Sequence, residues 1–203
     1  MNIFYLGNPQ ISAQELCDKH VVKMITESAQ MLCAAHWCKA NTLEKIEKLN
    51  LAKLFKPAHV GHPSTIWTRE TNEQYLWHYE LYVEMCKEYT RRYGKTHGSS
   101  RFIGVLDKPP EDLGTGWREP PQCMPEKYKC DDTIQAYRNY YIAEKKHFAK
   151  YKKDNDWHKT VRKLDLASMF TPGKTLASLS KDEREAVNKL LKLTNIKKEL
   201  ESM

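Results

Sequence analysis

The chain has 203 residues, a length that suits one ordinary domain with an appended segment and excludes two large domains. Lysine and arginine outnumber aspartate and glutamate by 33 to 26, a net charge of +7 that excludes an acidic, solvating protein. Forty per cent of the residues are hydrophobic, but no stretch reaches the roughly 20 apolar residues that a membrane span needs. The composition therefore predicts a soluble globular protein with no membrane partner.

The first predicted element is a long helix after an apolar segment, 1–6, and the turn Gly7-Asn8-Pro9. Ser12 followed by Glu15 forms a capping box, and apolar residues at helical spacing continue to Cys38. This pattern predicts one unbroken central helix of about seven turns. The apolar positions are Leu16, Val21, Met24, Ile25, Met31, Leu32 and Ala35.

More helices are predicted downstream. Thr42–Leu54 is amphipathic, and Pro63 suits the first turn of a following helix. That helix is expected to run to Tyr93, either unbroken or restarted at Thr71, where Gln74 completes a capping box, and to stop at Gly94. Its apolar side is a stripe expected to be core: Tyr75, Tyr79, Tyr82, Cys86, Tyr89 and Tyr93.

The remaining chain is predicted to be a loop followed by two helices. Residues 107–123 hold four of the nine prolines, which indicates a loop. A helix opens near 131–133 with one apolar side, and a short charged helix follows Ser180. The apolar side consists of Ile134, Tyr137, Tyr141, Phe148 and Tyr151. Strand signals are nearly absent, so we predict an all-α, compact helical domain over 1–157 and a basic helical C-terminal extension over 158–203.

Six cysteines are present, without any Cys-x-x-Cys pair and with irregular intervals. This spacing argues against a disulfide framework and against a zinc site, so we expect no metal and no cofactor. The first residues also lack the basic lead and long apolar run of a secretion signal, which predicts a cytoplasmic protein.

The positive charge is concentrated late in the chain. Six of the seven excess charges lie in residues 123–203, and residues 144–163 interleave eight basic side chains with aromatic ones. A basic, aromatic surface suits a phosphate backbone with bases to stack on, although a solvated lysine-rich helix has the same pattern.

One face of the first helix carries residues suited to acid–base chemistry. His20, Lys23, Glu27 and Gln30 follow one another at steps of three, four and three, so all project from one side, with Lys19 at its edge. This is either the wet face of the helix, with Lys23–Glu27 as an i,i+4 ion pair, or a site for proton transfer. Glu27 is the first candidate, since a carboxylate beside cations can accept a proton or stabilise positive charge on a sugar.

Two further groups suit nucleic-acid contacts. The loop His59–His62 precedes a helix start whose backbone donors can bind a phosphate. Residues 91–97 place Arg92, Lys95 and His97 around a helix end.

The motifs resemble those of a known family. Asp18-x-His20, Glu27, Gln30, Gly61-His62 and the pattern Trp67, Tyr75, Leu76, Leu81 resemble the phage-type pyrimidine-dimer DNA glycosylases of the endonuclease V kind. A closer resemblance, to phage proteins labelled with that name, covers most of 1–153 through the segments 18–24, 27–32, 62–67, 92–97 and 136–141.

The resemblance implies a compact helical enzyme that binds and kinks damaged duplex DNA. Its N-terminal amine attacks the deoxyribose carbon bearing the damaged base, a glutamate matched here by Glu27 assists, and the resulting imine permits strand cleavage. His20 matches a histidine of the family. An α-amine suits the task because its pKa near 8 leaves part of it unprotonated at pH 7. If a phage encodes the chain, the compartment is the host cytoplasm.

The chain departs from the family at two positions. Asn2 stands where the family exposes a threonine after removal of the initiator methionine, so the nucleophile is expected to be the Met1 amine or Lys23. Gln30 stands where the family carries an arginine, which removes one phosphate contact.

The sequence thus predicts a DNA glycosylase with abasic-site lyase action on damaged or modified pyrimidines. The expected catalytic residues are Glu27, His20, Met1 and Lys23. The expected contacts with duplex DNA are Lys19, Gln30, His62, Arg92, Lys95, His97, Arg138, Lys145, Lys146, Lys150, Lys152 and Lys153. Two alternatives stay open: a transferase acting on a modified pyrimidine of phage DNA, and a non-catalytic DNA-binding module.

Overall fold

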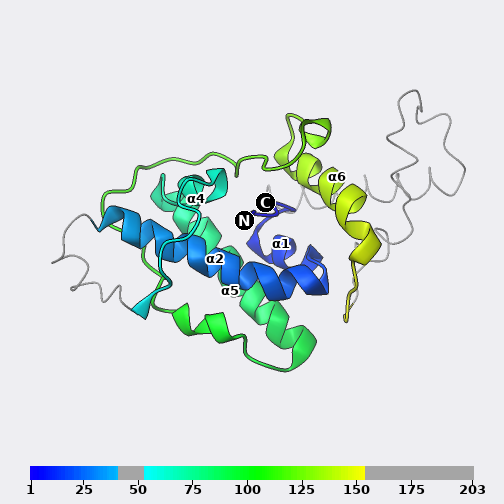
Figure 1. Ribbon diagram of the computed structural model, residues 1–203, viewed down its shortest axis with the longest axis horizontal. Coiled ribbons are helices and arrows are strands. Elements are labelled where there is room, and N and C mark those ends of the chain that lie inside the picture. The colour runs from blue at the N-terminus through cyan, green and yellow to red at the C-terminus, as the bar shows by residue number, and fades with distance from the viewer. Residues whose placement is uncertain (41–52, 154–203) are drawn as a thin grey trace, which may run out of the picture. The chain divides into compact units, whose positions relative to one another are not determined.

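The computed structural model describes residues 1–40 and 53–153, and every regular element within those ranges is a helix (Figure 1). The predicted all-α class is therefore confirmed for the described residues. The β pairing found among them is one isolated bridge, between Thr71 and Gly114. The chain divides into two compact units, Met1–Tyr137 and Arg138–Met203. The boundary predicted at 157 lies outside the described residues and stays a prediction.

Within the first unit, residues 1–40 and 53–137 contain four complete α-helices. They are α1 (Pro9–Glu15), α2 (Asp18–Lys39), α4 (Pro63–Thr68) and α5 (Asn72–Tyr93), accompanied by the 3-10 turns η2 (Gly98–Phe102) and η3 (Glu126–Tyr128). Helix α6 (Thr133–Lys145) begins in the first unit and continues into the second, where η4 (Lys146–Phe148) follows it. Among the described helices, none has the length and apolar character to cross a membrane.

The prediction of one unbroken helix from Ser12 to Cys38 is wrong. The chain forms α1 and α2 with a break between them, where Leu16 and Cys17 adopt extended backbone conformations. Both of these residues are buried, so the apolar pattern continues through the break although the helix does not. Apolar spacing reports which side chains reach the core, and it is insensitive to a two-residue change of backbone direction.

The predicted capping box at the start of this region is also wrong. The cap of α1 is Asn8, whose side chain accepts a hydrogen bond from Ile11 N at 2.9 Å, and Pro9 begins the helix. Ser12 lies inside α1, where its hydroxyl donates to the Gly7 carbonyl (2.9 Å) and accepts from Leu6 N (3.1 Å). Ser12 therefore ties the N-terminal segment to α1.

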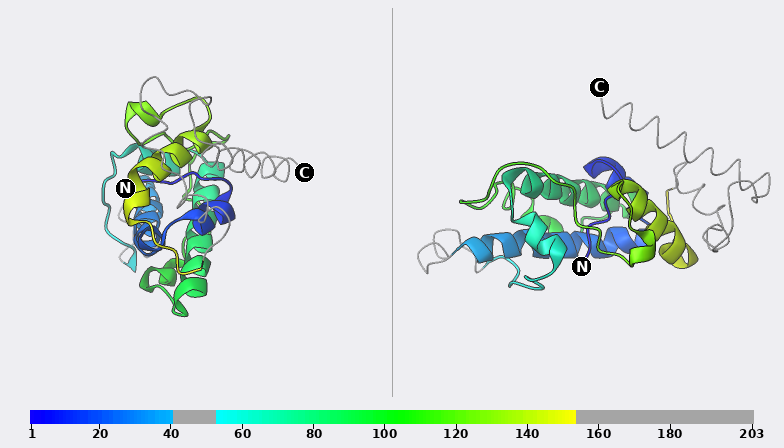
Figure 2. Two further views of the ribbon diagram at one scale, coloured as in Figure 1. Left: turned by 90° about the vertical axis from the view of Figure 1, so that its right-hand side faces the viewer. Right: turned by 90° about the horizontal axis from the view of Figure 1, so that it is seen from above.

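The two long helices, α2 and α5, pack side by side and run antiparallel (Figure 2). His36 near the end of α2 bonds Tyr75 near the start of α5, at 2.8 Å. Asp18 at the start of α2 bonds Arg92 near the end of α5, at 3.0 Å. All the apolar positions predicted for the first helical region are buried in this core: Leu16, Val21, Met24, Ile25, Met31, Leu32 and Ala35.

The predicted helix start at Pro63 and stop at Gly94 are confirmed, and the helix is restarted at Thr71, the second of the two options. Pro63 opens α4, where its missing N–H costs no helical hydrogen bond. The Thr71 hydroxyl caps α5 by accepting from Gln74 N at 3.2 Å. Gly94 ends α5 in the left-handed region, with φ of 64°, a conformation that glycine adopts without steric cost.

The tyrosine stripe of α5 is core at its centre and half-buried at its edges. Tyr75 and Tyr82 are fully buried, and their hydroxyls donate to the Leu106 carbonyl (2.9 Å) and the Ser99 carbonyl (2.5 Å). Tyr79, Tyr89 and Tyr93 are half-buried. The stripe thus joins α5 to the chain that follows it, because each buried hydroxyl finds a carbonyl there.

Two other expectations have mixed outcomes. Residues 107–123 form no helix, as predicted. Helix α6 ends at Lys145, so Phe148 and Tyr151, which the pattern placed on that helix, lie beyond its end. The helix predicted after Ser180 and the bulk of the one predicted over Thr42–Leu54 lie outside the described residues.

The proline-rich loop is anchored to the start of α5. Gly114 N donates to the Glu70 carbonyl at 2.8 Å, and its own carbonyl accepts from Asn72 N at 3.0 Å. A Cβ atom at position 114 would lie 3.0 Å from the Glu70 oxygen, so only glycine permits this approach.

Candidate active site

The N-terminal amine and the Glu27 carboxylate meet in the first unit. Met1 N lies 3.9 Å from Glu27 Oε2, and Lys23 Nζ lies 3.1 Å from Glu27 Oε1. The Met1 side chain is 2 % exposed and that of Glu27 14 %, whereas Lys23 is 64 % exposed. One carboxylate therefore faces two amines, the first on a residue whose side chain is buried and the second on a solvated arm.

His62 approaches this pair from the start of α4. Its Nδ1 caps the helix by accepting from Ser64 N at 3.2 Å. Burial lowers the pKa of His62, the nearby N-terminal ammonium lowers it further, and the Glu27 carboxylate opposes both effects. The imidazole thus responds to the charges of both Met1 and Glu27, although it was predicted from sequence as a DNA contact.

Helix α4 also holds the side chain of the first residue. Thr65 Oγ1 donates to Met1 Sδ at 3.6 Å. Because Glu27 belongs to α2 and Thr65 to α4, the N-terminal residue lies where these two helices pack together. The site consequently depends on their relative position.

His20, predicted as catalytic, packs beneath the N-terminal segment. Its ring stacks on Phe4 with centroids 4.7 Å apart and an interplanar angle of 18°. The side chain is buried. This placement supports the backbone that leads to Met1, and a part for His20 in the chemistry stays a prediction.

A buried imidazole joins the three helices behind the site. His78 of α5 lies 3.0 Å from Ser28 Oγ of α2 and 2.7 Å from Thr68 Oγ1 of α4. Thr68 gives its hydroxyl hydrogen to the Ser64 carbonyl (2.8 Å), so its oxygen accepts from His78 Nδ1 and His78 Nε2 accepts from Ser28. Burial lowers the pKa of His78 to about 3, which keeps the ring neutral. Through these bonds Ser28, the residue next to Glu27, is joined to α4, the helix that contacts Met1.

Arg92, predicted to contact DNA, lies inside the protein. Its side chain is fully buried and donates to the carbonyls of Leu16 (2.8 Å) and Gln14 (2.9 Å). It also pairs with Glu88 at 2.5 Å and Asp18 at 3.0 Å. These bonds satisfy backbone carbonyls at the break between α1 and α2. Arg92 would have to lose them in order to bind a phosphate.

The other predicted DNA contacts of the first unit are more accessible. Lys19 and Lys95 are exposed, and Gln30 is half-buried one turn beyond Glu27. His97 caps η2 by accepting from Ser99 N at 3.1 Å. Burial lowers its pKa, and a hydrogen bond with the Val22 backbone opposes that shift. His97 therefore attaches η2 to α2.

The remaining predicted contacts belong to the second unit. Arg138 is buried, and Lys145 lies over the Tyr140 ring at 4.7 Å. Lys146 is half-buried, whereas Lys150, Lys152 and Lys153 are exposed. Binding of DNA by these residues stays a prediction.

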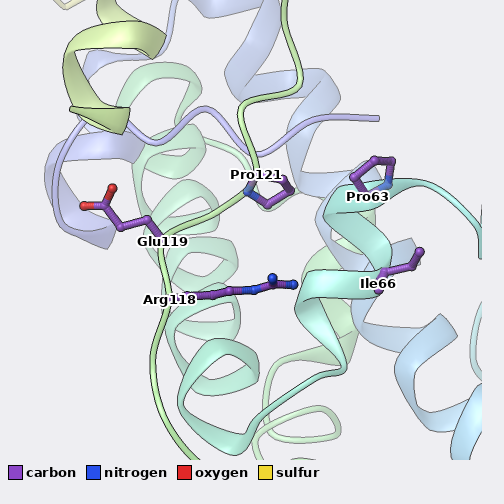
Figure 3. A pocket seen from close by; sticks show the side chains of 5 residues that line it. All are labelled: Pro63, Ile66, Arg118, Glu119 and Pro121. Atoms are coloured by element: carbon purple, nitrogen blue, oxygen red, sulfur yellow. The ribbon is translucent and has the colours of Figure 1, made fainter. Parts of the chain in front are cut away.

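A pocket of about 240 Å³ lies between α4 and the segment 118–121 (Figure 3). Pro63, Ile66 and Pro121 supply apolar walls, and Arg118 extends toward α4 while Glu119 points away from it. The Arg118 guanidinium pairs with Glu70, and the Arg118 backbone carbonyl accepts a hydrogen bond from Trp67 Nε1 at 2.9 Å. These two bonds anchor the 118–121 wall of the pocket next to α4, the helix that His62 caps.

The first 101 residues, which include every residue of this arrangement from Met1 to His78, match a family model described as pyrimidine dimer DNA glycosylase. Residues 1–101 of the chain are thus similar to the pyrimidine dimer DNA glycosylase family. The resemblance drawn from the motifs is thereby confirmed. Searches of curated proteins and of solved structures found no match to the chain.

The match to this glycosylase family makes DNA the expected substrate and DNA repair the expected setting. The matched range contains Met1, Lys23, Glu27, His62 and α5 up to its end. It does not include the segment 118–123 or α6, which contribute the pocket wall and further contacts to the N-terminal residues.

Several residues of the site have no signature in the sequence. His78 lies on the apolar side of its helix, where an isolated histidine has the appearance of core. Asn2 is a single polar residue within an apolar run, and Thr65 follows a helix start like many other threonines. Each has a partner 50 or more positions away in the chain, so only packing brings them together: the Asn2 amide bonds Cys123 O, Thr65 bonds Met1 Sδ and His78 bonds Ser28.

Proposed function

We propose that the protein is a DNA glycosylase with abasic-site lyase action, in which the Met1 α-amine is the nucleophile and Glu27 assists it. The substrate is a damaged or modified pyrimidine in duplex DNA. The observation that carries the proposal is the 3.9 Å separation between Met1 N and Glu27 Oε2 in a chain whose residues 1–101 match the pyrimidine dimer DNA glycosylase family. No metal or cofactor takes part in the proposed steps.

The chemistry proceeds in two stages. The unprotonated α-amine forms a bond to C1′ of the deoxyribose, the bond from C1′ to the damaged base breaks, and the base leaves with the bonding electrons and takes up a proton. The sugar ring then opens to an imine on the amine nitrogen. Loss of a proton from C2′ expels the 3′ phosphate by β-elimination, which cleaves the strand.

Glu27 is suited to two tasks in this sequence. Its carboxylate can accept the proton that the amine loses on attack, and it can stabilise the positive charge that develops on the sugar and on the imine nitrogen. The site is largely buried, which strengthens such interactions because little water screens them. The half-buried His62 ring, neutral at pH 7, adds no competing positive charge.

Borohydride trapping tests the proposal. The protein is incubated with a duplex that carries one thymine dimer and, separately, with an abasic duplex, and borohydride reduces any imine to a stable amine. We expect a covalent adduct whose peptide map places the DNA on Met1. Glu27→Gln should lower the trapping rate by about 10² to 10⁴, the range of general acid–base catalysis, while duplex binding is retained.

Glu84→Gln is the matched control, because Glu84 is also a lysine-paired helical glutamate of low exposure and lies on α5. It should trap at the wild-type rate. Absence of both adduct and cleavage on both duplexes contradicts the proposal. Mass spectrometry of the nucleosides then separates the two remaining functions: a changed base indicates a transferase, and unchanged nucleosides with salt-dependent binding indicate a non-catalytic module.

A further inference from the structure

The second residue of the chain is held at both ends of its side-chain amide. Asn2 Nδ2 donates to the Cys123 carbonyl at 3.0 Å. Asn2 Oδ1 lies 2.9 Å from the Tyr137 hydroxyl, a distance at which the hydroxyl can donate to it. The partners lie more than 120 positions away in the sequence, beyond the range that matches the glycosylase family.

The Tyr137 hydroxyl is the centre of a closed set of hydrogen bonds. It accepts from Cys123 N at 3.3 Å, and it donates either to Asn2 Oδ1 or to the Pro121 carbonyl, which lies 2.6 Å away. The Tyr137 side chain is fully buried, and its ring contacts Phe4 edge-on with centroids 6.3 Å apart. One phenol thus organises the segment 121–123 around the N-terminal segment.

The chemistry of these partners requires an amide at position 2. The Cys123 carbonyl can only accept, so it needs a donor, while the opposite end of the side chain faces a hydroxyl that can donate. Asparagine supplies both groups. An aspartate of the same shape supplies acceptors alone and would place its carboxylate against the Cys123 carbonyl oxygen.

The bonds of Asn2 also restrain the α-amine of Met1, the residue before it. Chain termini are ordinarily mobile, yet here Met1 is held through its buried side chain by Thr65 and through the next residue by Tyr137 and Cys123. A nucleophile attacks efficiently only when it is held near the reacting atom, and a misplacement of about 1 Å can cost about 100-fold in rate.

We propose that Asn2 and Tyr137 are positioning residues, and that the hydrogen bonds joining them to the segment 121–123 direct the Met1 α-amine toward Glu27. This inference rests on the proposed function, because it concerns the amine assigned there as nucleophile.

The test uses two variants that alter polar atoms and preserve shape. Tyr137→Phe removes only the hydroxyl, and Asn2→Asp replaces only the Nδ2 donor. Tyr75→Phe is the matched control, since Tyr75 is also fully buried, donates to a backbone carbonyl and accepts from a side chain, but lies against His36 near the far end of α2. Intact mass first establishes that each protein begins with Met1.

Three quantities are measured for each protein: the single-turnover trapping rate on an abasic duplex, the Kd for that duplex, and the midpoint of thermal unfolding. We expect trapping by Tyr137→Phe and Asn2→Asp to fall about 10- to 100-fold at saturating DNA, with Kd within about twofold of wild type. Tyr75→Phe should lower the unfolding midpoint without slowing trapping.

The results separate this inference from the proposed function. Wild-type protein that forms no adduct overturns the proposed function itself. Wild-type protein that traps while both variants trap equally fast overturns the positioning role. Variants that lose DNA binding and thermal stability along with trapping also overturn it, because the hydroxyl and the amide then serve the fold alone.

Discussion

At the scale of single residues, the site offers two amines to one carboxylate. In peptides an α-amine has a pKa near 8 and a lysine amine one near 10.4, so at pH 7 the α-amine class has far more of the unprotonated, nucleophilic form. The burial of the Met1 side chain and the exposure of Lys23 also favour the Met1 amine as the nucleophile, because a fixed nucleophile reacts faster than one on a solvated side chain. The ion pair of Lys23 with Glu27 then serves to orient the carboxylate.

The assignment predicts the behaviour of Lys23→Arg. Arginine keeps the positive charge beside Glu27 but is not a nucleophile at neutral pH, so the borohydride adduct should form within about threefold of the wild-type rate. The measurement is the rate of adduct formation on an abasic duplex. Complete loss of the adduct in Lys23→Arg, with DNA binding intact, would assign the nucleophile to Lys23.

At the scale of elements, two buried histidines join helices and make the fold sensitive to acid. Burial lowers the pKa of His36 to about 4 and that of His78 to about 3. In the unfolded chain both rings take up a proton below about pH 6.5, whereas in the folded protein they stay neutral. Stability is therefore complete above about pH 6.5 and declines as the pH falls toward 4.

The substitution His78→Asn should change how steeply the unfolding free energy falls with pH. Each histidine contributes up to about 1.4 kcal/mol per pH unit to the loss in unfolding free energy. His78→Asn retains a donor toward Thr68 and removes one titrating ring, so between pH 6 and 5 its slope should be shallower by about that amount. Urea unfolding at several pH values measures it, and an unchanged slope would contradict the neutral state of His78.

The junction of α1, α2 and α5 depends on one guanidinium. Arg92→Ala removes the donor from two backbone carbonyls and leaves the buried Glu88 paired with Arg91 alone, and breaking a buried pair in this way costs about 3–5 kcal/mol of unfolding free energy. Arg91→Ala removes a half-exposed partner of the same Glu88, and we expect it to cost about 1 kcal/mol or less. Equal losses in urea unfolding would contradict the structural role of Arg92.

At the scale of the whole molecule, the charge and the chemistry occupy different parts of the chain. The candidate site belongs to the nearly neutral residues 1–122, whereas six of the seven excess positive charges lie in 123–203. A lysine that binds a phosphate releases counterions, so removing its charge weakens binding and flattens the dependence on salt. The late basic residues are thus expected to bind DNA while the early ones act on it.

Neutralising the late lysines tests this division. Changing Lys145, Lys146, Lys150, Lys152 and Lys153 to glutamine should raise the Kd for duplex DNA and reduce the slope of log K against log salt by about 0.9 for each phosphate that is no longer neutralised. Single-turnover trapping at saturating DNA should survive. The control changes the same number of exposed basic residues of 1–122 to glutamine: Lys53, Lys56, Lys87, Arg101 and Lys108. Equal weakening of DNA binding in both proteins would mean that only the total charge matters.

The sequence by itself determined the all-α class, the resemblance to the glycosylase family, the first residue of α4, the caps of α5 and the core positions of α2, such as Met31 and Leu32. These features are readable because each depends on residues three or four positions apart, whose spacing on a helix is set by backbone geometry. Glu27 was found in the same way, since its neighbours on one helix face mark it as part of a polar group.

Only the tertiary structure decided what the basic and polar side chains do. Arg92 has the sequence context of a phosphate ligand, yet it closes the break between α1 and α2, and His62 and His97 cap helices. The bonds of Asn2 with Tyr137 and of His78 with Ser28 join residues 135 and 50 positions apart. A charged or polar residue has the same local pattern whether it faces solvent or a buried carbonyl, and the difference arises only when packing brings distant partners within hydrogen-bond distance.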